Sequence, residues 1–165
     1  MQTKPLLKLK LSSFDRTFEI LGYSALIFLW IFTIYVYFKL PDKIPTHFNF
    51  SGNPDNYGNK ISIIILPAIA TIIFFLMTFL NRYPHVFNYA VAITDENAER
   101  QYTLATRMIR FLKVVILINF TFINFFTYLT ATGKSNGLWP WFIPCMLALI
   151  IIPIIFFIYR SLKAK

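Results

Sequence analysis

The chain has 165 residues, of which 57% are hydrophobic, 19% aromatic and only 14% charged, and its formal net charge is +9. An ordinary soluble domain carries about 25% charged residues, and a water-soluble protein of this length could not hide so much apolar surface in one core. The composition therefore excludes a soluble globular domain. The basic residues are scattered along the chain, which argues against a nucleic-acid-binding patch.

Four long uncharged runs predict four transmembrane helices. They cover residues 20–38, 61–80, 114–133 and 135–159. About 20 apolar residues, at about 1.5 Å per residue, cross the ~30 Å hydrocarbon core of a bilayer. The runs are continuously apolar rather than alternating, which excludes the strands of a β-barrel. We therefore predict an all-α membrane protein with a single four-helix transmembrane domain over residues 1–165, whose spans lie at about 18–39, 61–80, 112–132 and 138–159.

The first helix is predicted to begin near Ser13 and to end at Leu40. Ser12 and Asp15 fit a capping box before the apolar run, and Pro41 stops the helix. Basic residues precede this run, as in a signal peptide, but the run is too long and lacks a small-x-small cleavage site. We expect it to stay in the protein as an anchor. We interpret the residues before Ser12 as a basic tail at the membrane surface.

Basic residues are divided unequally between the two sides of the predicted membrane. Twelve lie before the first span, between the second and third, or after the fourth, and four lie on the other side, namely Lys39, Lys43, Lys60 and Lys134. The positive-inside rule then places both termini and residues 81–111 in the cytoplasm. Residues 40–60 face the periplasm, the cell surface or an organelle lumen.

The third span is predicted to continue a cytoplasmic helix. Thr94 is a suitable N-cap, and no helix breaker follows as far as residue 131. Roughly the first 15 residues of this helix would stand outside the lipid, with Arg107, Arg110 and Lys113 at the level of the phosphates.

The predicted spans carry few groups suited to transport. None holds an acidic or basic residue or a histidine in its interior, and pumps and coupled transporters need such groups at membrane depth.

Asn124 lies on a polar stripe with Thr121 and Tyr128, which suits hydrogen bonding between helices. Cys145 is the single cysteine and lies in the fourth span, so no disulfide within the chain can form.

The connection between the first two spans has an unusual composition. Its sequence, LPDKIPTHFNFSGNPDNYGNK at residues 40–60, is rich in proline, glycine and asparagine. Pro54 occupies the position that a type I turn over residues 53–56 favours, and Gly52 and Gly58 would supply positive φ. We therefore predict an ordered loop. Its candidate binding residues are Asp42, His47, Asn49, Gly52, Asp55, Gly58 and Lys60.

Known metal and nucleophile patterns do not fit this loop. A calcium loop starting at Asn53 would need a glutamate where Ile64 stands, and the outer side offers too few ligands for a closed zinc site. Ser51 has no glycine elbow. We predict no cofactor, bound metal or catalytic residue. One alternative is a metal-assisted hydrolase that uses His47 and Asp55, and another is that the polar residues merely cap the helix ends.

The loop resembles a bacterial domain of unknown function that also forms the N-terminal part of SdpI-type immunity proteins. The shared pattern comprises Leu40-Pro41-Asp42, Ile44-Pro45, His47-Phe48-Asn49, Gly52, Asp55, Gly58 and Lys60. Residues 84–88, 93–94 and 99–100 are similar more loosely. The resemblance implies a multi-pass protein of the bacterial inner membrane that protects a cell from its own toxic peptide or, as in one system, serves as a sensor that captures a repressor at the membrane. SdpI-type proteins commonly carry a further membrane region, which this chain does not show.

Three functional hypotheses follow from the sequence. In the first, the outer loop binds a toxin peptide, a lipid or a membrane protein partner in an immunity or sensing role. In the second, the chain is a structural or accessory subunit of a larger membrane complex. In the third, it is the surface hydrolase described above. The lipid bilayer is a partner in each case, nucleic acid is not, and oligomerisation is compatible with all three.

Overall fold

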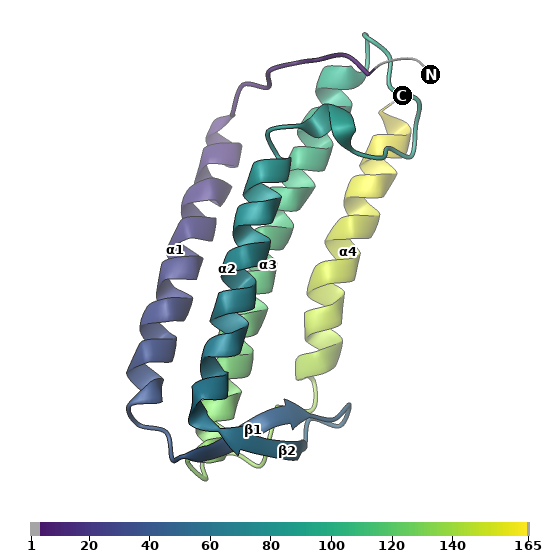
Figure 1. The fold of residues 1–165 in the computed structure, drawn as a ribbon. Helices are drawn as coiled ribbons and strands as arrows, with labels where there is room; N and C mark the ends of the chain where they lie inside the picture. The colour runs from purple at the N-terminus through teal and green to yellow at the C-terminus, as the bar shows by residue number, and fades with distance from the viewer. Residues whose placement is uncertain (1–3, 165) are drawn as a thin grey trace.

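The computed structural model describes residues 4–164, which form an elongated bundle of four long helices with a two-stranded sheet at one end (Figure 1). The helices are α1 (Ser13–Tyr37), α2 (Ile65–Leu80), α3 (Ala98–Ala131) and α4 (Phe142–Lys163). The sheet consists of β1 (Lys43–Phe48) and β2 (Pro54–Asn59). The described chain begins and ends at the opposite end of the bundle. We call the two ends the hairpin end and the termini end.

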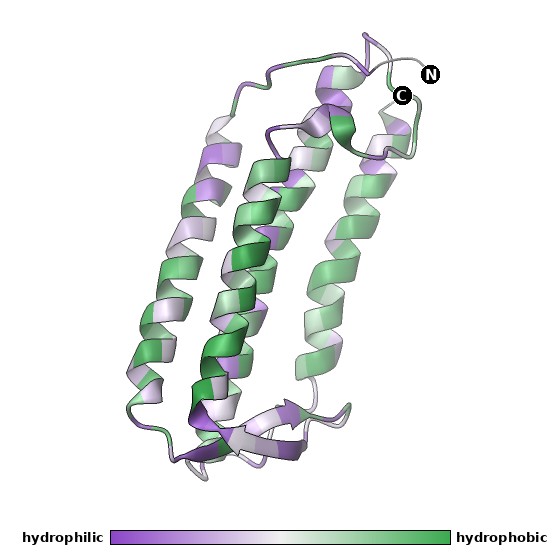
Figure 2. Ribbon diagram, viewed as in Figure 1, coloured by the Kyte–Doolittle hydropathy of each residue, from purple (hydrophilic) through white to green (hydrophobic). Residues whose placement is uncertain are grey.

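Within the described residues, four helices are long and apolar enough to cross a membrane, as predicted. The second of them includes a 3₁₀ segment, η1 (Lys60–Ile64), which continues directly into α2. Figure 2 shows hydrophobic residues along the middle of each helix and hydrophilic residues where α1, α3 and α4 approach the termini end. Large apolar side chains such as Ile31 and Phe75 are exposed on the outside of the bundle, where lipid would cover them. The chain is a multi-pass membrane protein.

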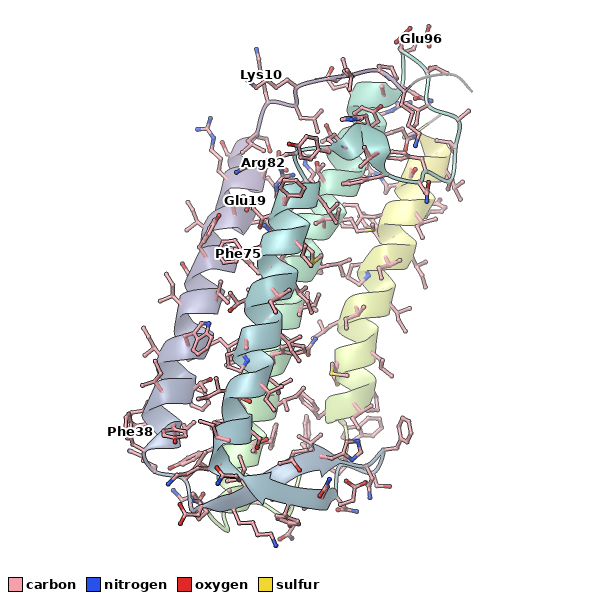
Figure 3. The ribbon with its side chains drawn as sticks, in the orientation of Figure 1. Lys10, Glu19, Phe38, Phe75, Arg82 and Glu96 are labelled. Atoms are coloured by element: carbon pink, nitrogen blue, oxygen red, sulfur yellow. The ribbon has the colours of Figure 1, made fainter. Side chains whose placement is uncertain are left out.

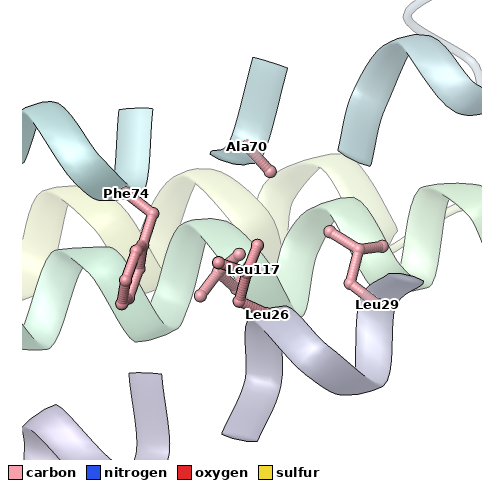
Figure 4. Packing of buried hydrophobic residues seen from close by; sticks show 5 residues of the cluster. All are labelled: Leu26, Leu29, Ala70, Phe74 and Leu117. Atoms are coloured by element: carbon pink, nitrogen blue, oxygen red, sulfur yellow. The ribbon is translucent and has the colours of Figure 1, made fainter. Parts of the chain in front are cut away.

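Helix α3 is the centre of the bundle. It packs against α1, α2 and α4, whereas the contacts of α4 are mainly with α3. Close packing of α1, α2 and α3 buries one apolar cluster (Figure 4), formed by Leu26, Leu29, Ala70, Phe74 and Leu117. Near the hairpin end the side chain of Asn124 on α3 is buried and donates hydrogen bonds to Thr33 Oγ1 (2.9 Å) and to the carbonyl of Ile63 (3.3 Å). This amide therefore links α3 to α1 and to η1, as the polar stripe suggested.

The start of α1 follows the predicted capping box. The Ser12 hydroxyl accepts a hydrogen bond from the Asp15 amide, and the Asp15 carboxylate accepts one from the Ser12 amide. These bonds satisfy donors that the first helical turn leaves free. The helix ends at Tyr37, three residues earlier than Leu40, the predicted end.

The predicted start of α3 was wrong by three residues. The N-cap is Asn97 rather than Thr94, and 3₁₀ helix η2 (Pro84–Val86) and a turn at residues 95–97 precede it. Asn97 does not cap the helix with its side chain; its Oδ1 accepts a hydrogen bond from the Thr94 amide at 3.0 Å. A side-chain bond between these residues stabilises the turn, so the helix begins after it. The Glu96 carboxylate accepts hydrogen bonds from the Thr94 hydroxyl and from its own backbone amide, and these bonds lower its pKa.

The N-terminal residues are more ordered than a free tail. Residues 4–11 run across the termini end of the bundle, from α1 toward the start of α3 (Figure 1). The Tyr102 hydroxyl donates to the Pro5 carbonyl at 3.0 Å, and the Lys4 ammonium donates to the carbonyl of Phe87. Burial raises the pKa of the Tyr89 hydroxyl, which lies in this part of the structure. These contacts hold the segment against the helix ends.

Candidate functional site at the hairpin end

Residues 43–59 form a β-hairpin, so the prediction of an all-α protein was wrong for this segment, for which we expected an ordered loop. Strands β1 and β2 pair antiparallel, with Lys43 opposite Asn59 and Phe48 opposite Pro54. The register shifts on either side of His47, which marks an irregularity in the ladder. Proline residues are tolerated here because a two-stranded sheet has only edge strands.

The turn of the hairpin lies at residues 49–53, and the predicted type I turn at 53–56 was wrong. The Gly52 amide donates to the Asn49 carbonyl (2.8 Å), and the Asn49 amide donates to the Asn53 carbonyl (2.9 Å). Gly52 has φ +81°, as a three-residue loop with a left-handed closing residue requires. Asn49 Oδ1 also accepts from the amides of Ser51 and Asn53. Asn49 and Gly52 thus shape the turn.

Gly58 lies within β2 and does not have the positive φ that we expected. A Cβ at this position would come within 2.9 Å of Thr46 Cγ2 on the facing strand. The close cross-strand contact, and not a turn, explains why glycine fits here.

Both ends of the hairpin are fixed to the bundle. At the turn, the Leu138 amide donates to the Gly52 carbonyl at 2.8 Å, which joins the hairpin to the connection between α3 and α4. At the base, Ile44 and Ile63 are buried in a second apolar cluster with Val36 and Leu40. The hairpin therefore has a defined position over the helix ends.

His47 and Asp55 form an exposed pair on the hairpin. His47 Nδ1 lies 2.5 Å from Asp55 Oδ1. A carboxylate can only accept, so Nδ1 carries the proton, and Nε2 is the ring nitrogen that this bond leaves unused. The two side chains are 66% and 43% exposed. The pair presents a fixed imidazole and a carboxylate to solvent.

Asp42 and Lys60 form the second pair, at the base of the hairpin. Lys60 Nζ lies 2.9 Å from Asp42 Oδ1, and the Lys60 amide donates to the Asp42 carbonyl at 2.9 Å. The hydrogen bond from the Lys60 ammonium lowers the pKa of the Asp42 carboxyl below its ordinary value of 3.8. The contribution of Asp42 to stability is therefore present above pH 3.8 and is lost as the pH falls below it.

The seven predicted residues do not converge on a single point. They form the His47–Asp55 pair, the Asp42–Lys60 pair, the turn with Asn49 and Gly52, and the close contact at Gly58. The two pairs stand about five residues apart along the strands, which corresponds to roughly 15 Å. Within residues 4–164 no three His, Cys, Asp or Glu side chains lie close enough to hold a metal ion.

An apolar cavity of about 340 Å³ lies beneath the hairpin. Its walls come from the hairpin, α2, α3 and the start of α4, and include Ile44, Phe48, Leu66, Ile123, Phe142 and Met146. His47, Asn124 and Thr127 also line it. The volume lies at the lower end of the range for pockets that bind small ligands, and it would hold one or two apolar side chains of a larger ligand.

The structure also contains a buried charge cluster that the sequence analysis missed. Asp15 and Glu19 on α1 face Arg107, Arg110 and Lys113 on α3, at the termini end. Arg110 Nε and Lys113 Nζ each lie 2.9 Å from a Glu19 oxygen, and the Lys113 side chain is fully buried. These cations were expected among lipid phosphates. Their spacing of three residues, which puts them on one face of a helix, was the signal that could have paired them with Asp15 and Glu19.

Part of the chain is similar to known sequences. Residues 25–71 match the "Domain of unknown function (DUF1648)", from the middle of α1 through the hairpin to the first turns of α2. An "Uncharacterized protein" of Archaeoglobus fulgidus is 36% identical over 76 residues, which cover 41% of this chain and 42% of that protein. The chain thus matches less than half of this relative's length. No solved structure matches. Neither description states an activity.

Proposed function

We propose that the chain is an SdpI-like immunity or sensing protein that binds a hydrophobic peptide at its hairpin end, outside a cytoplasmic membrane. The observation that carries the proposal is the apolar cavity under a hairpin whose position is fixed. A peptide would place an apolar side chain in the cavity and a polar group beside the exposed His47–Asp55 pair. Such a division between an apolar anchor and a few polar contacts is common in binding sites.

The extent of the family match supports the hairpin as the recognition element. The matched residues include all of β1 and β2 and the helix ends that hold them. They do not include α3 or α4, which supply the far wall of the cavity. We infer that the hairpin is the common part of such proteins and that the facing wall adapts the site to a particular ligand.

The proposal requires the hairpin to face away from the cytoplasm. We expect a cysteine introduced at Ser51, in a Cys145→Ser background, to react with a membrane-impermeant maleimide in intact cells. A cysteine introduced at Glu96, near the termini end, should react only after the cells are broken open. The opposite labelling pattern would exclude binding at the outer surface.

Peptide binding can be tested by protection and by cross-linking. Cells that express the chain should tolerate about tenfold more of at least one peptide from a panel of synthetic hydrophobic and amphipathic antimicrobial peptides, which corresponds to about 1.4 kcal/mol. The His47→Ala and Asp55→Ala variants should lose this protection, because each breaks the pair that we assign to the polar contact. Ser51→Ala, at the exposed turn, is the matched control and should keep it.

A photoreactive residue at Phe48, in the cavity wall, should cross-link the protective peptide, and one at the lipid-facing Ile31 should not. Normal protection by both alanine variants, at equal amounts in the membrane, would rule out the hairpin as the recognition surface. Protection by no peptide of the panel, together with no cross-link at Phe48, would contradict peptide binding.

A further inference from the structure

A second cavity lies at the termini end of the bundle and plays no part in the proposed peptide site. Its volume is about 630 Å³. One wall is the N-terminal segment with Leu6, Leu7, Leu9 and Leu11, and another is the end of α2 with the turn after it, from Thr78 to His85. Glu19 and Arg110 of the buried charge cluster form its floor. The cavity is thus bounded by leucines on one side and by charged and polar groups on the others.

The charges around this cavity favour an anion. The cluster at its floor contains three cations, Arg107, Arg110 and Lys113, but only two carboxylates. Lys8 and Arg82 are exposed on the cavity walls. Within the described part of the chain, neither has a carboxylate oxygen within 4.0 Å. Figure 3 shows Arg82 and Glu19 near each other at the termini end, below the segment that carries Lys10.

The leucines indicate that the ligand is amphipathic. Leu6, Leu7 and Leu11 are 79%, 40% and 43% exposed although they lie in a segment that is held against the helix ends. A free phosphate or a nucleotide would leave them in water. The cavity lies where membrane helices end, which is the level of lipid headgroups, and basic pockets between helix ends bind such groups.

We propose that this cavity binds the headgroup of an anionic phospholipid such as phosphatidylglycerol. The phosphate lies between Arg82 and Lys8, and the upper part of an acyl chain packs against the leucines. Because the site and the hairpin lie at opposite ends of the bundle, failure of one proposal does not imply failure of the other.

Native mass spectrometry of the purified full chain in a nonionic detergent tests this site. The protein is titrated with dioleoyl phosphatidylglycerol and, separately, with dioleoyl phosphatidylcholine. We expect phosphatidylglycerol to bind at least tenfold more tightly. The Lys8→Gln/Arg82→Gln double variant should lose about 10- to 30-fold in that affinity, since each cation at a membrane surface contributes about a factor of five.

The matched control is Lys10→Gln/Arg16→Gln, which removes the same charge from exposed residues outside the cavity and should change the affinity less than threefold. Equal losses in the two double variants would show only general attraction to a basic surface and would overturn the proposal. So would equal binding of the two lipids. In a further experiment, inorganic phosphate or glycerol 3-phosphate is added to the complex with phosphatidylglycerol. Displacement of phosphatidylglycerol by either at millimolar concentration would identify a site for small soluble anions instead.

Discussion

Replacement of Glu19 by leucine should destabilise the bundle by roughly 3 kcal/mol, because it leaves two buried cations without their common carboxylate. Arg110 and Lys113 both donate to Glu19 at 2.9 Å. Without Glu19, Lys113 would retain only the Thr78 hydroxyl as a hydrogen-bond partner, and an uncompensated ammonium group would remain buried. The measurement is the free energy of unfolding by SDS in mixed micelles, which we expect to fall by this amount in Glu19→Leu.

Removal of the cationic partner should lower the free energy of unfolding much less. Lys113→Met removes the buried ammonium group itself, and Glu19 then still accepts from Arg110. A buried ion pair contributes little over an apolar pair of similar size, whereas half a pair is costly. We therefore expect Lys113→Met to cost about 1 kcal/mol or less, and the double variant Glu19→Leu/Lys113→Met to be more stable than Glu19→Leu alone.

Asp95→Leu is the control for the comparison of Glu19→Leu, Lys113→Met and the double variant. Asp95 is an exposed carboxylate in the turn before α3, so its loss should change stability by less than about 0.5 kcal/mol. If Glu19→Leu cost no more than Lys113→Met, the cluster would not behave as a buried ion network. The result would then indicate that water or headgroups solvate these charges.

The helices could be predicted from the sequence because the membrane imposes a local rule. Each uncharged run is long enough to span the bilayer, and backbone hydrogen bonds in lipid must be made within the run. The capping box at Ser12 is local in the same sense and is confirmed. The start of α3 was misplaced because Thr94 and Asn97 are both good capping residues, and the turn between them decided the boundary.

The hairpin could not be predicted from strand patterns. KIPTHF and PDNYGN do not alternate between apolar and polar residues, and each contains a proline. They form strands because Ile44 packs into the cluster below them and Gly52 bonds to the connection between α3 and α4. The bond from Leu138 to Gly52 joins residues that are far apart in the sequence. A proline at position 54 then suggested a turn where a strand begins.

The charged residues show the same limit. Arg107, Arg110 and Lys113 precede an apolar run, and from position alone they belong among lipid phosphates. In the structure they form ion pairs with Asp15 and Glu19, which lie more than 90 residues earlier in the sequence. Glu19 and Lys113 lie at the ends of the expected spans 18–39 and 112–132, so the prediction that the span interiors carry no charge does not extend to the span ends.

The contact between the hairpin turn and the connection of α3 with α4 should be lost when Gly137 is replaced by alanine. Gly137 has φ +153°, and a Cβ there would stand 2.2 Å from the Gly52 carbonyl oxygen, which is part of the backbone and cannot turn aside. The connection must move away from the hairpin and break the bond from Leu138 to Gly52. Strain and the lost bond together should cost roughly 3 kcal/mol.

Gly133 provides a matched control in the same connection. Its φ is +71°, but a Cβ at this position would meet no atom within 4 Å. Gly133→Ala should therefore cost only the backbone strain, about 1 kcal/mol. Amide hydrogen exchange of Leu138 should accelerate strongly in Gly137→Ala and little in Gly133→Ala, because only the former breaks its hydrogen bond. Equal costs and equal exchange rates would mean that the hairpin does not depend on this contact for its position, and a hairpin held only at its base would leave the cavity beneath it without a fixed roof.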